Sequence, residues 1–437
     1  IVGGGTAACI LANRLSEDGR NTVLMLEAGG EPRSMWISIP AGFTKLLNDP
    51  VYNWRFESKP EDSVMGRAIS IPRGKGLGGS TLINGMIYVH GQSQDFDHWA
   101  HMGAHGWSGS DVAPYFSRLE TYMPGGDARG KQGPMNIDQV RERYPIASAM
   151  IDGVNIYGGG SGASHMISGH YTAHDQLEQA LAATQAKYIP NVKGLFFSTG
   201  YMANMAAITG ISAGLGENQT MSIFSEELNH ASLIDGVRLA SKQNNAKVFV
   251  YAHQNLVALQ KLLSEDKSQF KLIVTDGVFS MDGNIAPIDQ LLALAKKYDA
   301  LLLIDDAHGF GVLGDDGHGI LESFKIDAQN ISANRIIYIG TLGKAAGLSG
   351  AFIAAHKHLT EWILQKGRAY IYTTASPPAI AHGLLKSLEL IQQAQHRNAL
   401  HQNIAYWRKH LKLHKWQLIE SSTAIQPIVI GRNEDAL

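Results

Sequence analysis

The second half of the chain alternates short apolar segments with helical ones, and this alternation limits the folds open to it. Apolar segments of strand length lie at residues 271–275, 300–304 and 335–339. Between the first two, a helix is predicted to begin at Pro287 and to carry leucines at helical spacing. Such alternation is typical of a mainly parallel sheet that helices cover on both faces. We therefore expect an α/β fold that binds ligands beyond the carboxyl ends of its strands.

Two of these strands are followed directly by residues suited to chemistry. Asp305 comes after the strand 300–304, and Lys344 lies in the glycine- and alanine-rich run 340–347 that follows the strand 335–339. Glycines leave the lysine room and let the backbone approach a ligand. A carboxylate at the mouth of a parallel strand is well placed to pair with a protonated pyridine nitrogen. The alternatives are a helix-capping role for the aspartate and an ordinary surface position for the lysine.

The motifs of this half resemble the α-oxoamine synthases, which use pyridoxal 5'-phosphate (PLP). The resemblance runs from about Gly159 to the end of the chain and implies the PLP-dependent transferase fold of type I. In that family, a glycine-serine loop such as 158–170 approaches the substrate. The matching motifs follow one another in the family's order, at residues 158–170, 172–182, 198–204, 227–232, 278–283, 305–309, 340–347 and 372–378.

The resemblance also implies a set of site residues. Lys344 would hold PLP as a Schiff base and move a proton, Asp305 would keep the pyridine nitrogen protonated, and His308 would contact the phenolic oxygen. His230 would stack on the ring, although a lone histidine is more often structural. Further cofactor contacts are implied for Gly200 and Tyr201 through their backbone, Ser280 near the cofactor oxygen, Thr341 at the phosphate, and Thr374 at the phosphate of a neighbouring subunit.

The activity implied is a carbon–carbon bond-forming acyl transfer. The pattern is closest to the biotin-synthesis members, which condense L-alanine with a pimeloyl thioester of CoA or acyl carrier protein. Carbon dioxide is lost, and 8-amino-7-oxononanoate is the product. Glycine with acetyl-CoA or succinyl-CoA is the close variant within the family. The role of Thr374 implies a homodimer with shared active sites.

The first part of the chain carries an unrelated glycine pattern. Gly3, Gly5 and Ala8 have the spacing G-x-G-x-x-A, before a helix to Leu15 and a strand over 21–26 that leads into Glu27. This order is typical of a βαβ dinucleotide-binding unit, in which the pyrophosphate lies at the helix N-terminus and the carboxylate binds a ribose. A tight structural turn is the alternative.

A second glycine-rich stretch, residues 73–86, indicates which family this part of the chain resembles. It resembles the glucose-methanol-choline family of FAD-dependent oxidoreductases, and the resemblance extends from Ile1 to about Ala147. It implies a partial Rossmann-like module with FAD contacts at Gly3, Gly5, Glu27, Gly79 and Asn84. The family's catalytic histidine does not follow. An FAD-dependent alcohol or choline-type oxidoreductase is the alternative function, and an inactive fusion fragment is the third.

We therefore expect a chimera, arising from gene prediction, assembly or deliberate fusion; the alternative is a natural fusion in which the first half is a scaffold. The expected domains are a partial FAD module at 1–150, a junction at 151–158, a PLP-binding large domain at 159–395 and a truncated small domain at 396–437. In the last, 425–430 is predicted as a strand and 432–437 as the start of a helix. The family's arginine that grips the amino-acid carboxylate would come later.

The composition limits which partners, cellular location and metal ligands we expect. The chain has 37 basic and 39 acidic residues and a formal charge of -2, which does not favour nucleic acid. The single cysteine, Cys9, excludes an internal disulfide and suits a reducing, cytoplasmic location. No apolar run is long enough to predict a membrane span. A zinc site at His98, His101 and His105 is disfavoured because glycines interrupt the helix that would align them, so no metal is expected.

Overall fold

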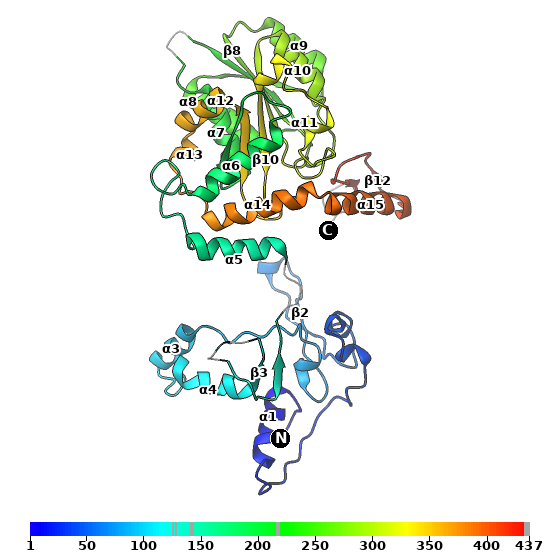
Figure 1. The fold of residues 1–437 in the computed structure, drawn as a ribbon. Coiled ribbons are helices and arrows are strands. Elements are labelled where there is room, and N and C mark those ends of the chain that lie inside the picture. The colour runs from blue at the N-terminus through cyan, green and yellow to red at the C-terminus, as the bar shows by residue number, and fades with distance from the viewer. Residues whose placement is uncertain (125, 127–128, 140–143, 216–218, 432–437) are drawn as a thin grey trace. The chain divides into compact units, whose positions relative to one another are not determined.

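A computed structural model describes residues 1–437 except 125, 127–128, 140–143, 216–218 and 432–437 (Figure 1). The chain divides into two compact units, residues 1–141 and 142–437. Among the described residues, no helix is both long and apolar enough to cross a membrane.

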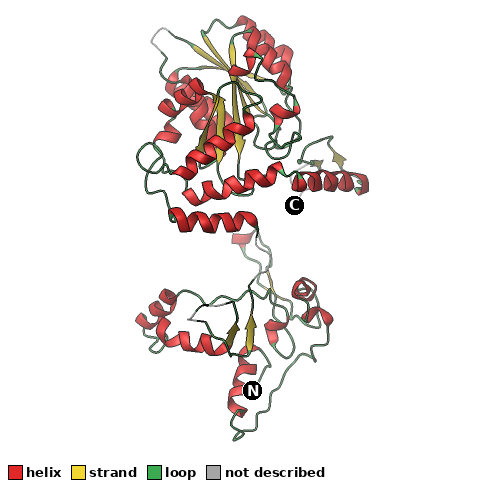
Figure 2. Cartoon of the chain, in the orientation of Figure 1, coloured by secondary structure: helices red, strands yellow, loops and turns green. Residues whose placement is uncertain are grey.

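The larger unit is built on a seven-stranded sheet (Figure 2). Its strand order is β5-β11-β10-β9-β8-β6-β7, and only β11 runs antiparallel to its neighbours. The three strands predicted from the sequence are β8, β9 and β10, so the mainly parallel sheet is confirmed. The strands are β5 (Val192–Phe197), β6 (Met221–Glu226), β7 (Lys247–Tyr251), β8 (Phe270–Asp276), β9 (Ala300–Asp305), β10 (Ile336–Thr341) and β11 (Ala351–His356).

Both faces of the central strands are buried, which explains why β9 and β10 are apolar along most of their length rather than alternating. Successive side chains of a strand point to opposite faces. Leu302 belongs to a core cluster with residues of the helices α6, α10 and α14, whereas Leu303 belongs to a second cluster with residues of α7, α8 and α12. These helices are α6 (Thr172–Gln185), α7 (Gly200–Ser212), α8 (Ala231–Asn244), α10 (Ile288–Lys297), α12 (Lys357–Lys366) and α14 (Pro378–Gln392), and α9 (Leu256–Glu265), α11 (Ile320–Ser323) and α13 (Arg368–Ile371) complete the layers.

A helix, α5 (Pro145–Tyr157), occupies most of the segment expected as a junction. A proline at its first turn and Gly158 beyond its end, with φ +83°, define its limits. Gly153 allows α5 to approach α14, because a β-carbon there would lie 2.9 Å from Ala379 Cα. This helix is therefore an integral part of the larger unit.

The described segment after α14 contains one helix and one short strand pair. Helix α15 (Gln395–His410) precedes a two-stranded antiparallel pair, β12 (Gln417–Leu418) and β13 (Ile428–Val429). The strand predicted over 425–430 is thus reduced to two residues, because its partner supplies only two. The helix predicted over 432–437 lies outside the described residues.

The smaller unit has little sheet. The predicted helix is α1 (Thr6–Ser16), but the strand predicted over 21–26 is wrong, because the structure has one parallel bridge, between Val2 and Leu26. A strand needs a bonded neighbour, and the neighbouring run 1–3 bonds only with Leu24 and Leu26. The other elements are α2 (Phe43–Leu46), α3 (Ser93–His101), α4 (Gly109–Leu119), β1 (Phe56–Glu57) paired with β2 (Ser70–Ile71), and β3 (Glu120–Tyr122) paired with β4 (Met135–Ile137).

Candidate active site

Lys344 and His308 meet at the carboxyl edge of the sheet. Lys344 lies three residues after β10, His308 lies three residues after β9, and Lys344 Nζ is 2.5 Å from His308 Nε2. The Nδ1 of His308 lies 3.2 Å from the carbonyl of Val278 and therefore carries the proton, so Nε2 accepts from the lysine. Partial removal from water lowers the pKa of Lys344, and burial lowers the pKa of His308 to about 4. The pair thus favours a neutral imidazole beside an amine that gives up its proton more readily than usual.

Asp305 is the last residue of β9, and its side chain is buried at the site. Its Oδ2 accepts a 2.6 Å hydrogen bond from Asn204 Nδ2, and its Oδ1 accepts the backbone N–H of Ala307. Burial raises the pKa of Asp305, against the effect of the Asn204 bond. Asp276, at the end of the neighbouring strand β8, is also buried, and its pKa is raised by burial and by the Asp305 charge. Because both carboxyl groups are buried, a positively charged group of a ligand would be stabilised between these strand ends.

His230 lies directly before α8, beside the same strand ends. Its backbone N–H donates to Asp276 Oδ2 over 2.7 Å, and its Nδ1 accepts the backbone N–H of Ser232, which caps the helix. The residue is exposed beside these strand ends. The histidine therefore has a capping role, and this role is compatible with stacking.

The start of α7 and the end of β10 form a cradle for an anion. Gly200 is the first residue of α7, and a β-carbon there would lie 2.8 Å from Thr341 Oγ1. A side chain at position 200 would displace the Thr341 hydroxyl, so glycine keeps this approach open. The first backbone N–H groups of a helix have no partner within it, so those of Gly200 and Tyr201 are available beside a hydroxyl. The side chain of Tyr201 turns away to donate to Asp235.

The remaining two predicted PLP residues have less defined surroundings. Ser280 is half-buried in the turn after β8, two residues beyond the Val278 carbonyl that holds His308. Thr374 is exposed, next to Ala375, whose backbone N–H donates to Ala163 in the glycine-serine loop. The buried Ser161 hydroxyl donates to the Ala375 carbonyl over 2.7 Å, so this loop is tied to the segment that carries Thr374.

This set of residues fits PLP. It combines an amine of lowered pKa, a buried carboxylate with no cation bonded to it among the described residues, and an anion cradle on adjacent strand ends. The buried Asn204 Oδ1 has no hydrogen-bond partner among the described groups, although its Nδ2 bonds both Asp305 and Ser232. Lys344 can form an imine, Asp305 can hold a pyridinium, and the α7 cradle can take a phosphate.

Two residues of this site were missed in the sequence. Asn204 follows Gly200 by four residues, so both lie on one face of α7, and this spacing was the available signal. Asp276 ends β8 as Asp305 ends β9, and the register pairs them side by side. A search for polar residues at the ends of predicted strands would have indicated Asp276.

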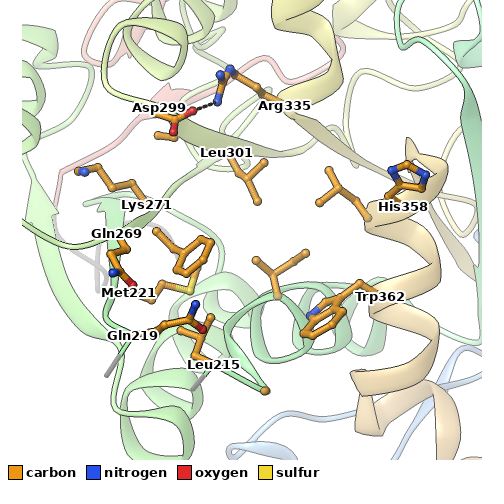
Figure 3. Close-up of a pocket in the computed structure, with 15 residues that line it drawn as sticks. Leu215, Gln219, Met221, Gln269, Lys271, Asp299, Leu301, Arg335, His358 and Trp362 are labelled. Carbon is orange, nitrogen blue, oxygen red and sulfur yellow. Dashed lines mark hydrogen bonds and ion pairs between the residues drawn. The ribbon is translucent and has the colours of Figure 1, made fainter. Parts of the chain in front are cut away.

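A large hollow at the opposite edge of the sheet holds none of the predicted residues (Figure 3). It measures about 510 Å³ and is lined mainly by apolar side chains, among them Met221 and Trp362. Met221 begins β6, whereas Lys344 follows the end of β10. The Arg335 guanidinium on its rim is paired with Asp299 at 2.7 Å.

The smaller unit has a glycine-lined cavity of about 520 Å³. Gly3, Gly5, Glu27 and Gly79 line it, and Asn84 does not: its side chain accepts the backbone N–H of Met86. A β-carbon on Gly79 would lie 2.8 Å from Gly5 Cα, so the two glycine motifs touch. The structure therefore brings together four of the five residues predicted to contact FAD.

Glu27 has a second role in this cavity. Its carboxylate accepts backbone N–H groups from Gly29, Gly4 and Gly76, and these bonds lower its pKa. The carboxylate thus ties the first glycine motif to the second, and it stays ionised while it does so. A ribose would use the lone pairs that these bonds leave.

Comparison with known proteins divides the chain in a similar place. Residues 146–437 match the sequence model of the class I and II aminotransferases, and residues 1–180 match that of the GMC oxidoreductases. The 8-amino-7-oxononanoate synthase of Janthinobacterium sp. (strain Marseille) is 51% identical over 295 residues, which cover 67% of this chain and 71% of that protein. The enzyme of the same name from Ralstonia pickettii (strain 12J) is 50% identical over 301 residues, with 67% and 70% covered.

Solved structures share the fold over about two thirds of the chain. The serine palmitoyltransferase of S. paucimobilis with a bound PLP–myriocin aldimine superposes with a TM-score of 0.55 at 30% identity, over 63% of this chain and 66% of that one. The Sphingomonas wittichii serine palmitoyltransferase gives 0.54 at 28% identity, over 64% and 66%. The fold expected for the second half is confirmed by these likenesses.

Proposed function

Residues 146–437 belong to the class I and II aminotransferase family, and from this premise we propose that the chain condenses L-alanine with a pimeloyl thioester in a PLP-dependent reaction. The product is 8-amino-7-oxononanoate, an intermediate of biotin synthesis, and carbon dioxide and CoA or carrier protein are released. The meeting of Lys344 and His308 above the buried Asp305 carries this proposal. The relatives named for this reaction, at about 50% identity, support the choice of substrates.

Each site residue has a task that follows from its surroundings. PLP, when bound, supplies an electron sink that stabilises negative charge on the amino-acid Cα. Lys344 holds the cofactor and then removes the Cα proton, for which its lowered pKa suits it. Asp305 would keep a proton on the ring nitrogen through its negative charge. His308 contacts Lys344 and would meet the ring oxygen, His230 would cover the ring face, and Gly200, Tyr201 and Thr341 would hold the phosphate.

Several finer points stay predictions from the sequence. Glycine with a shorter acyl-CoA is the alternative substrate pair. A homodimer, to which Thr374 would contribute across the interface, and a cytoplasmic location belong to the same proposal. So do the roles of Ser280 and of the small C-terminal segment 396–437.

A substrate matrix tests the function. The PLP-loaded chain is given alanine or glycine together with pimeloyl-CoA, acetyl-CoA or succinyl-CoA, while thiol release and product mass are followed. We expect thiol release and carbon dioxide loss with alanine and pimeloyl-CoA above all other pairs. Faster turnover of glycine with a short acyl-CoA would move the chain to another reaction of the same family. Retention of PLP without turnover of any pair would contradict the proposal.

A second candidate function concerns the smaller unit, for which we propose binding of FAD. The observation in its favour is the cavity in which Gly3, Gly5, Glu27 and Gly79 come together. Oxidation of an alcohol by this flavin is the alternative activity of the chain. Flavin reduction on anaerobic addition of choline or a primary alcohol would support that activity.

Replacing Gly79 by valine should abolish FAD binding. Gly79 has φ +58°, which disfavours a β-branched side chain, and the added carbon would meet Gly5 Cα at 2.8 Å. Titration of FAD, followed by quenching of its fluorescence, measures the effect. The control is Gly85→Ala, which adds a methyl group where nothing lies within 4 Å. Equal FAD affinity in the wild type and in Gly79→Val would exclude this cavity as the binding site.

A further inference from the structure

Two histidines of the glycine-serine loop face each other through the same ring atom. His165 Nδ1 lies 2.8 Å from His170 Nδ1, and the ring of His174, on α6, packs against both. Side-chain nitrogens of all three lie within 4.8 Å of one another. The proposed PLP chemistry uses none of them.

The hydrogen-bond partners of each ring show which nitrogens could bind a metal ion and which already have a structural role. His174 accepts the backbone N–H of Tyr171 at Nδ1 and therefore donates from Nε2 to the carbonyl of Ser376, so neither nitrogen is available. His170 Nε2 lies 3.1 Å from Asp175 Oδ1 and donates to it. Only the two facing Nδ1 atoms remain as a pair that could share something larger than a proton.

Their separation is close to what a metal ion requires. Two nitrogens bound at 2.0–2.1 Å to a tetrahedral zinc ion lie about 3.3 Å apart, so the rings must separate by only about 0.5 Å. Asp175 orients His170 as carboxylates orient metal-bound histidines, by accepting the proton of the other ring nitrogen. We propose that His165 and His170 bind a divalent transition-metal ion of the zinc class, with Asp175 as the orienting carboxylate.

The surroundings hold the rings in place and supply water. The half-buried ring of His165 stacks on Tyr370 and contacts the ring of His174, which fixes it beside His170. The Asp175 side chain is 61% exposed and that of His170 is 23% exposed, so water reaches the site and completes the coordination. Glu178 also lies close, but its Oε1 accepts the backbone N–H of Phe196, and burial raises its pKa to about 7.

The ion would act on the loop. His165 and His170 belong to the loop 158–170, and Asp175 belongs to the first turn of α6. The loop is already bonded at Ser161 and Ala163 to the segment around Ala375. A metal ion would cross-link His165 to His170, and the His170–Asp175 bond already joins this end of the loop to α6, so the loop would be held at both ends, whatever reaction the neighbouring site performs.

Metal binding by the full chain, purified without a polyhistidine tag and stripped with chelator, tests the site. We expect about one equivalent of Zn²⁺ to be retained on dialysis, and Co²⁺ to give a visible absorption band of a low-coordinate site. His165→Gln and His170→Gln should each lose that equivalent and that band, and Asp175→Asn should weaken binding by about 10- to 100-fold. Because His165 also stacks on Tyr370, the His170 and Asp175 variants keep the test valid if His165→Gln unfolds.

The matched control is His358→Gln, which removes one ring of the pair His356–His358, whose centroids are 4.8 Å apart. That pair has no ion pair with a carboxylate among the described residues, and the control should bind the metal like the wild type. Retention of the Co²⁺ band in both His170→Gln and Asp175→Asn would overturn the proposal. Failure of the wild type to retain any metal would do the same.

Discussion

Replacing Lys344 by alanine should remove the borohydride-fixable absorption of the PLP-loaded chain and lower the condensation rate by about 10³-fold or more. The wild type should show a PLP band that borohydride reduces and fixes to the protein, because an imine joins the two. The alanine variant has neither the amine that forms this bond nor the base that removes the Cα proton. Absorption spectra before and after borohydride, beside the thiol-release assay, measure both losses.

Two further variants separate this role from a general effect of charge. Lys344→Arg keeps the cation beside His308 but cannot form an imine, so it should lose the fixable band as well. Lys261→Ala removes an exposed lysine on α9 and should leave spectrum and rate unchanged. A band that borohydride still fixes in Lys344→Ala would show that another lysine holds the cofactor. A wild type that binds flavin and no PLP would place the function in the smaller unit.

Replacing Asp305 by asparagine should lower the rate by about 10²- to 10⁴-fold while the cofactor stays bound. Asparagine has nearly the same shape, and Lys344 still forms the imine. The variant lacks the negative charge that keeps the ring nitrogen protonated, so the ring withdraws electrons poorly from Cα. The fixable band should persist as kcat falls, which distinguishes this variant from Lys344→Ala.

Asp306→Asn is the neighbouring control. Asp306 is also buried, but its Oδ2 accepts from Tyr338 and from the backbone of Ile320, on the side away from Asn204. Burial raises its pKa to about 7, so the stability that its proton contributes is present at acid pH and is lost as pH rises through about 7. Its replacement should change the pH dependence of stability and leave the kcat of the folded enzyme close to that of the wild type. Equal losses of kcat in the two variants would refute a special role for Asp305.

Much of the site could be predicted because it depends on short segments. Asp305 and Lys344 each follow a strand that its own apolar residues identify, and parallel strands bring their carboxyl ends to one edge. Gly200 and Thr341 belong to motifs of the same kind, one at a helix start and one at a strand end. The resemblance to a known family added the roles, which these patterns alone leave open.

Other features depended on residues far apart in the sequence. Asn204 binds Asp305 across 101 positions, and Ser161 binds Ala375 across 214, and no local pattern indicates either bond. The expected junction became a helix because Gly153 lets α5 pack on α14, more than two hundred residues later. The strand predicted over 21–26 does not form, because a strand needs a neighbour that bonds along its length, and here only one bridge is present.

The sequence by itself therefore determined that strands and helices alternate in the second half of the chain, and which residues follow three of its strands. Hydrophobic periodicity and glycine or proline positions act over a few residues, and they are readable one segment at a time. The tertiary structure alone decided which polar groups meet: Lys344 with His308, Asp305 with Asn204, and His165 with His170. Such contacts, and the pKa shifts that they bring, arise from burial and distance, which exist only once the chain has folded.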